Sequence, residues 1–107
     1  MRLNENSSRE EILKWIEIYL FEFLYNFSDK PWAQPYIDEA AKIYVQRSPR
    51  SFLNYFSHKP WAQPYIEEAA KEAAKKDPKY YLKHLVDRFP QGINLALFAL
   101  GGKNDSK

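Results

Sequence analysis

The sequence predicts an all-α fold, a right-handed α-solenoid of about three antiparallel helix pairs with degenerate units capping the two ends. The first observation is a tandem repeat: Lys30–Lys42 and Lys59–Lys71 differ only at Asp38 versus Glu67. The second is that apolar residues recur at helical spacing on both sides of each copy. A unit this short cannot bury its apolar face alone, so neighbouring copies are expected to stack.

Length and composition describe an ordinary globular chain. Its 107 residues favour one domain, and 45% apolar with 28% charged residues is a typical balance. The net charge of +2 is too small to indicate a nucleic-acid partner, which would require concentrated Lys and Arg. The absence of Cys excludes disulfides and thiolate chemistry.

The N-terminal segment predicts neither secretion nor a membrane span. Its first residues are polar and lack an apolar region before a cleavage site, so a cytoplasmic location is expected. Ile12–Phe27 is strongly apolar, but Lys14, Glu17 and Glu22 interrupt it. It also falls short of the ~20 apolar residues that a spanning helix needs. We expect a buried or interface-facing helix instead.

The first helix is expected to follow a disordered lead at residues 1–7. Ser8 and Glu11 form a capping-box pattern, which predicts a helix start at about Arg9. Its apolar residues continue to Phe27 and widen beyond one face. Such a helix is covered on more than one side, either by other helices of the chain or by a partner.

The repeated segment opens with two prolines. Pro31 suits a helix start, where its missing N–H is not needed. Pro35 leaves two alternatives: the helix begins near Trp32, or it restarts at Pro35 after a turn around Trp32. An apolar stripe then follows at Tyr36, Ile37, Ala40, Ala41 and Tyr44, and its alanines would let another backbone approach closely.

The second unit repeats this plan. Ser48 followed by Pro49 predicts a capped helix that runs to about Phe56, and Asp77-Pro78 repeats the cap one period later. Ion pairs between residues four apart are expected on the outer faces of the long helices. These pairs are Asp38–Lys42, Glu67–Lys71 and Glu72–Lys76.

The third unit departs from the pattern. Arg88–Gly92 replaces the repeated motif, Ile93–Leu100 predicts a short terminal helix, and Gly101-Gly102 predicts its end. We therefore expect one helical-repeat domain over residues 8–102, with core repeats at about 23–51 and 52–80 and a disordered tail at 103–107. The cap at Ser8 and the glycine stop favour a whole domain over an excerpt of a longer array.

A period of 29 residues (Lys30 to Lys59), a Ser-Pro or Asp-Pro start and the Lys-Pro-Trp-Ala joint resemble short α-solenoid repeats. They are similar in kind to tetratricopeptide and HEAT-type hairpins and to helical-hairpin repeats of uncharacterised bacterial proteins. The 34-residue period and Leu-Gly pair of tetratricopeptides are missing. The resemblance covers about Phe23 to Phe89. It implies an interaction scaffold and supplies no catalytic residues.

No residue pattern indicates enzyme chemistry, a metal or a cofactor. His58 and His84 are the only histidines, and no Cys completes a zinc set. Neighbouring carboxylates on a helix diverge by about 100°, so they do not converge as an acid/base pair. The carboxylate pairs concerned are Asp38-Glu39 and Glu67-Glu68.

Aromatic residues are the candidates for structure and binding. We interpret Trp32 and Trp61, with Pro31 and Pro60, as structural anchors of the hairpin joints, although tryptophan is also common at binding hot spots. Tyrosine combines an apolar ring with a polar tip, which suits a half-exposed groove for a protein or peptide. The candidate partner-binding residues are Tyr25, Tyr36, Tyr44, Tyr55, Tyr65 and Tyr80.

The leading hypothesis is a non-enzymatic protein–protein interaction scaffold whose partner is an unknown protein or peptide. The alternative is a self-associating structural protein, joined through the apolar terminal helices Ile12–Phe27 or Ile93–Leu100. A homodimer is the commonest outcome of such pairing. A third hypothesis is attachment to a membrane surface through Trp15 and Phe21.

Overall fold

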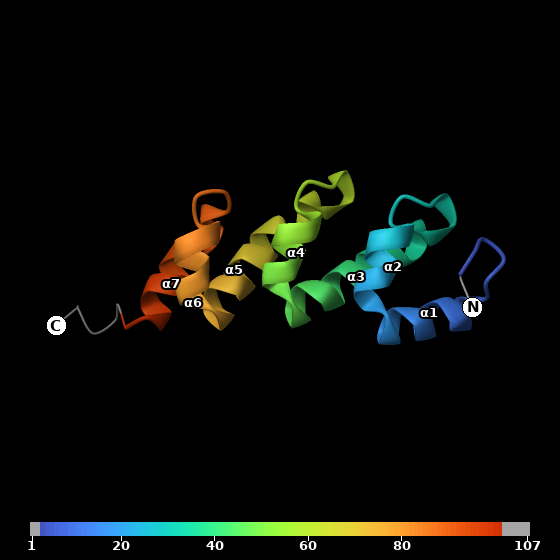
Figure 1. Cartoon of the computed structure of the whole chain (residues 1–107), viewed down its shortest axis with the longest axis horizontal. Coiled ribbons are helices and arrows are strands. Elements are labelled where there is room, and N and C mark those ends of the chain that lie inside the picture. The colour runs from blue at the N-terminus through green and yellow to red at the C-terminus, as the bar shows by residue number, and fades with distance from the viewer. Residues whose placement is uncertain (1–2, 102–107) are drawn as a thin grey trace. The chain divides into compact units, whose positions relative to one another are not determined.

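A computed structural model describes residues 3–101, and every regular element in that range is helical (Figure 1). The all-α prediction is confirmed. The α-helices are α1 (Arg9–Ile18), α2 (Leu20–Phe27), α3 (Gln34–Arg47), α4 (Pro49–Phe56), α5 (Ile66–Lys76), α6 (Pro78–Tyr80) and α7 (Ile93–Ala99). Tight 3-10 turns form η1 (Pro31–Ala33), η2 (Pro60–Tyr65) and η4 (Pro90–Gly92), and η3 (Tyr81–Leu85) is π-helical.

The chain divides between Tyr44 and Val45 into two compact units. The N-terminal unit holds α1, α2, η1 and most of α3, and the C-terminal unit holds the end of α3 and all later elements. A single domain over residues 8–102 stays a prediction. The predicted tail at 103–107 lies outside the described residues.

The predicted helix start is confirmed, but the single helix through Phe27 is wrong. Ser8 Oγ accepts from the Glu11 backbone N–H at 3.1 Å, and the Glu11 carboxylate accepts from the Ser8 N–H at 2.9 Å. Tyr19, with φ −122° and ψ 57°, then separates α1 from α2. A segment apolar on several sides buries more of its surface as two short helices, since each can turn its own stripe inward.

The segment before α1 is ordered in its described part. Leu3 is only 5% exposed. The backbone N–H of Ser7 donates to the carbonyl of Asn4 at 2.9 Å. Residues 3–7 were expected to belong to a disordered lead, and the burial of one large apolar side chain is what holds them against the N-terminal unit.

Each copy of the repeat places a tryptophan against a buried phenylalanine. The Trp32 and Phe27 ring centroids are 5.4 Å apart, and those of Trp61 and Phe56 are 5.5 Å apart. Both indoles follow a proline at the start of a 3-10 turn. In the first copy α3 then begins at Gln34, so a turn around Trp32 followed by a restart is the correct alternative.

A glutamine closes the same turn in both copies. Gln34 Nε2 donates to the carbonyl oxygens of Ser28 and Lys30, each at 2.9 Å. Gln63 Nε2 makes the same two bonds, to the carbonyls six and four residues earlier, at 2.8 and 2.9 Å. Ser28 and Ser57 are the C-caps of α2 and α4, where backbone acceptors have no partner within the helix. Lys30 and Lys59 are the N-caps of η1 and η2. The glutamine therefore joins the end of one helix to the start of the next.

Within the C-terminal unit, small residues on α5 allow the turn that contains Gly92 to pack closely against this helix. Ala70 and Ala74 are fully buried, and a Cβ atom on Gly92 would lie 2.7 Å from the Ala70 carbonyl oxygen and 2.8 Å from Ala74 Cβ. A close backbone approach was predicted at Ala40 and Ala41 of the first copy, and the structure shows one at the alanines of α5.

Several cap and charge predictions are confirmed and two need correction. Asp77 accepts from the Tyr80 N–H at 3.3 Å, as a cap should, but Ser48 makes no side-chain cap bond to α4. Lys75, rather than Lys76, pairs with Glu72, at 3.0 Å. The pairs Asp38–Lys42 at 3.2 Å and Glu67–Lys71 at 2.9 Å form as predicted.

Candidate interaction surfaces

Exposed large apolar side chains gather in two segments of the described chain. Of eight such residues only Tyr55 lies outside the segments 12–27 and 93–100. The members are Ile18, Tyr19 and Tyr25 near the first segment's helix break, Tyr55 on α4, and Ile93, Leu97, Phe98 and Leu100 at α7. The two terminal segments that the sequence predicts as possible self-association interfaces are therefore also the ones that expose large apolar side chains.

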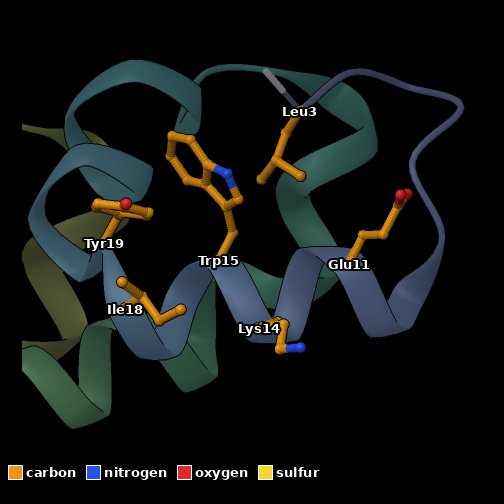
Figure 2. A pocket seen from close by; sticks show the side chains of 6 residues that line it. All are labelled: Leu3, Glu11, Lys14, Trp15, Ile18 and Tyr19. Atoms are coloured by element: carbon orange, nitrogen blue, oxygen red, sulfur yellow. The ribbon is translucent and has the colours of Figure 1, made fainter. Parts of the chain in front are cut away.

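The first surface is a hollow beside α1. It has a volume of about 490 Å³ and is lined by Leu3, Glu11, Lys14, Trp15, Ile18 and Tyr19. Figure 2 shows the Trp15 indole standing between Leu3 and Tyr19. The Trp15 ring lies 5.0 Å from Tyr19 and 5.8 Å from the core ring of Phe27. The Trp15 and Tyr19 rings therefore line the hollow, and the core ring of Phe27 packs against Trp15.

The second surface is the outer face of α7. Leu97 is 48% exposed and Phe98 is 58% exposed. Both side chains belong to a helix whose buried residue is Ala96 and whose Leu95 is half-buried, so Leu97 and Phe98 lie on the face that points away from this packing. No charged residue occurs in the segment 93–100.

When the third turn is aligned with the repeat, exposed apolar residues of α7 fall at positions that are polar in the repeat. The turn Pro90–Gly92 corresponds to Pro60–Ala62, because both open with proline in a 3-10 turn and end on a fully buried small residue. In this alignment Ile93, Leu97 and Phe98 fall at the positions of Gln63, Glu67 and Glu68.

The replaced residues on α5 are polar and engaged at the surface. Glu67 pairs with Lys71, whose hydrogen bond and charge lower the pKa of this carboxyl, and Glu68 accepts from Gln46 Nε2. The third unit thus carries apolar side chains where the repeat carries hydrated ones. This signal is present in the sequence, but it becomes visible only when Pro90 is aligned with Pro60.

The predicted tyrosines occupy different environments. Tyr25 and Tyr55 are exposed, and Tyr36 and Tyr65 are half-buried. Tyr44 is 8% exposed and its ring lies 6.2 Å from Phe21, which leaves little of it accessible to a ligand.

Tyr80 belongs to a surface cluster in the C-terminal unit. The Arg50 guanidinium lies 4.2 Å from the Tyr80 ring centroid, and the His84 ring lies 4.6 Å from it. Arg50 also pairs with Asp77 at 3.2 Å. The structure brings Tyr80 together with Arg50 and His84 rather than with another of the predicted tyrosines.

The tryptophan and proline anchors lie at the turns. Trp32 and Trp61 are half-buried against core rings, while Pro31 and Pro60 are exposed. Trp61 also lies 6.0 Å from Phe52, and its Nε1 is buried without an acceptor. The two indoles are therefore placed as packing residues at the turns. The glutamine bonds at the same turns were not anticipated, because adjacent prolines and tryptophan dominated the pattern.

Within residues 3–101, no cluster of metal-ligating side chains is present, and no helix is long and apolar enough to cross a membrane. Comparison with known proteins yields no matching family model, no matching curated protein and no matching solved structure. Function is therefore inferred from the surfaces themselves.

Proposed function

We propose that this protein is a non-enzymatic protein–protein interaction scaffold, in which tandem helical hairpins stack as an α-solenoid and the apolar face of α7 is a binding surface. The observation that supports it is the exposure of Leu97 and Phe98, at 48% and 58%, at positions where the repeat carries glutamate. Exposed apolar surface that is gathered on one element, rather than scattered singly, is typical of an interaction site.

Energetics favour a partner for this face. Fully burying one Leu or Phe side chain stabilises an association by roughly 1.5–3 kcal/mol. Leu97 and Phe98 are neighbours on a helix that also exposes Ile93. A cluster of this kind can supply the apolar centre of an interface, around which polar residues such as Asn94 form a rim.

Site-specific photo-crosslinking in cells that produce the protein tests this proposal. A photoreactive phenylalanine analogue at position 98 should give protein adducts after irradiation. The matched control is the same analogue at Glu39, which is exposed on α3 and occupies the equivalent position in the first copy. Adducts at position 98 and not at position 39 are expected. Equal labelling of both positions, or none at either, would remove α7 as the binding surface.

The tyrosine cluster is a second candidate surface for the same function. Tyr80 lies under Arg50 and beside His84, and a ring held by a cation and a second ring offers a rigid contact for a peptide. The photoreactive analogue at position 80 distinguishes this surface from α7, since adducts there without adducts at position 98 would transfer the binding role to the cluster.

A further inference from the structure

We propose that the partner of α7 is a second copy of this chain, and that α7 of one copy docks into the hollow beside Trp15 on α1 of the next. The inference deepens the proposed function and rests on it, because it names the occupant of the same surface. The two surfaces belong to different units, so the contact would be heterologous, with one patch of each kind per copy.

The repeat register relates α1 to the long second helix of each hairpin. Ile12 stands one period before Ala41 and two periods before Ala70, and all three are buried. Tyr19 ends α1 with φ −122° and ψ 57°, close to the values of −142° and 63° at Ser48 and of −145° and 71° at Asp77. Helix α1 therefore corresponds to the later part of α3 and α5.

Helix α7 corresponds to the early part of the same element. It follows the 3-10 turn η4 as α3 follows η1, and it ends at Ala99, before Gly101 with φ 100°. Its last positions coincide in register with the first turn of α1. Helices α1 and α7 thus correspond to overlapping parts of the same repeat helix. Helix α7 exposes large apolar side chains, whereas α1 borders the hollow.

Stacking within the C-terminal unit is the precedent for the contact. There the alanine face of α5 packs against the turn that contains Gly92, and Gly92 lies next to Ala70 and Ala74. Leu100 stands at the position of Ala70 and is 45% exposed. Among the described residues no following unit covers this position, and a second copy would continue the stacking that α5 and α7 begin.

Shape and the aromatic lining of the hollow favour it over a second α7 as the docking surface. The hollow of about 490 Å³ is lined by four apolar or aromatic side chains together with the charged Glu11 and Lys14, and another hollow cannot fill it. The α7 face exposes the side chains of Leu97 and Phe98, and the segment 93–100 carries no charge. Pairing α7 with α7 would leave the hollow empty, whereas Phe98 in the hollow would meet tryptophan and tyrosine, the residues that dominate binding hot spots.

Complementation of two defective variants tests the proposal. Sedimentation equilibrium of the full chain should show a mass above the monomer that rises with concentration. Phe98→Glu and Ile18→Glu should each weaken self-association at least about tenfold. An equimolar mixture should restore a one-to-one dimer, because each variant retains the surface that the other lacks. The matched controls are Tyr55→Glu on α4 and Tyr25→Glu on α2, both exposed aromatic positions outside the proposed contact, and both should associate normally.

Each remaining outcome decides the question. If Ile18→Glu associates as the natural chain does while Phe98→Glu does not, α7 pairs with α7 and the head-to-tail contact is wrong. A chain that stays monomeric, with adducts of a different protein at position 98, overturns this inference and leaves the proposed function intact. A monomer without such adducts removes both. Far-UV circular dichroism checks folding, and Leu97→Lys with Tyr19→Lys replaces the pair if either variant unfolds.

Discussion

The carbonyl oxygen of Ala70 occupies space that a side chain at Gly92 would need. A Cβ atom at Gly92 would lie 2.7 Å from this oxygen and 2.8 Å from Ala74 Cβ. Both neighbours belong to α5, and one of them is backbone, so neither can move without displacing the helix. The contact explains why the third unit has glycine where the two complete copies have the alanines Ala33 and Ala62.

Gly92→Ala should destabilise the protein by about 1–3 kcal/mol, because an added methyl group overpacks the contact with α5. Urea unfolding followed by circular dichroism measures the change. Asn94→Ala, two residues later and exposed, is the control and should stay within about 0.5 kcal/mol of the natural chain. An unchanged midpoint for Gly92→Ala would mean that the third unit does not pack this closely on α5.

Gln63→Met should destabilise the protein by about 1–2 kcal/mol, since the thioether cannot donate the two hydrogen bonds to the carbonyls of Ser57 and Lys59. Thermal unfolding measures the loss. Gln91→Met provides the control, because Gln91 is an exposed glutamine in the third turn. Equal effects of the two substitutions would show that the Gln63 amide contributes nothing specific.

Trp61→Ala should destabilise the protein by about 3 kcal/mol, because it removes a large ring that packs against Phe52 and Phe56. Equilibrium unfolding in urea gives the value. Glu67→Gln, on the exposed face of α5, should leave the midpoint unchanged. A loss below about 1 kcal/mol for Trp61→Ala, with helicity intact, would point to a ligand-binding role for this indole instead.

Stability should fall as the pH rises above about 10, the ordinary ionisation range of tyrosine. Burial raises the pKa of Tyr81. Its hydroxyl donates to the Phe89 carbonyl and accepts from the Gly92 N–H at 2.9 Å. The unfolded chain releases this proton at lower pH than the folded chain does, so the contribution is complete below pH 10 and is lost as the pH increases through the raised pKa.

Urea unfolding between pH 8 and 11 measures this dependence. The control is Tyr81→Phe, which lacks the ionisable group. It should be less stable at neutral pH by about 1–3 kcal/mol, because it leaves the Phe89 carbonyl and the Gly92 N–H unpaired, and its decline at high pH should be shallower. Parallel declines of the two proteins would assign the pH dependence to other groups.

Sequence patterns predicted the start of a helix well where that start depends on only a few neighbouring residues. The capping box at Ser8, the start of α4 at Pro49 and the terminal helix from Ile93 depend on hydrogen bonds and dihedral angles within a few residues. The break at Tyr19 was missed. The helical spacing of apolar residues continues through Tyr19. Two helices are favoured over one only because each can bury its own apolar stripe.

The candidate surfaces were predicted less completely. The two apolar terminal segments were named as possible interfaces, and they do contain most of the exposed large apolar residues described here. The tyrosines were grouped by residue type, although Tyr44 is buried and Tyr25 is exposed. Exposure depends on which neighbouring element covers a side chain, and a residue's own chemistry does not specify this.

By itself, the sequence determined the helical class, the repeat and the positions of caps and prolines, because these follow from interactions between residues close along the chain. Only the tertiary structure decided that Gln34 and Gln63 close the turns, that Gly92 lies against α5, and that Phe98 faces outward while Trp15 borders a hollow. The physical reason is that burial and close packing depend on residues distant in the sequence, whose approach no local pattern encodes.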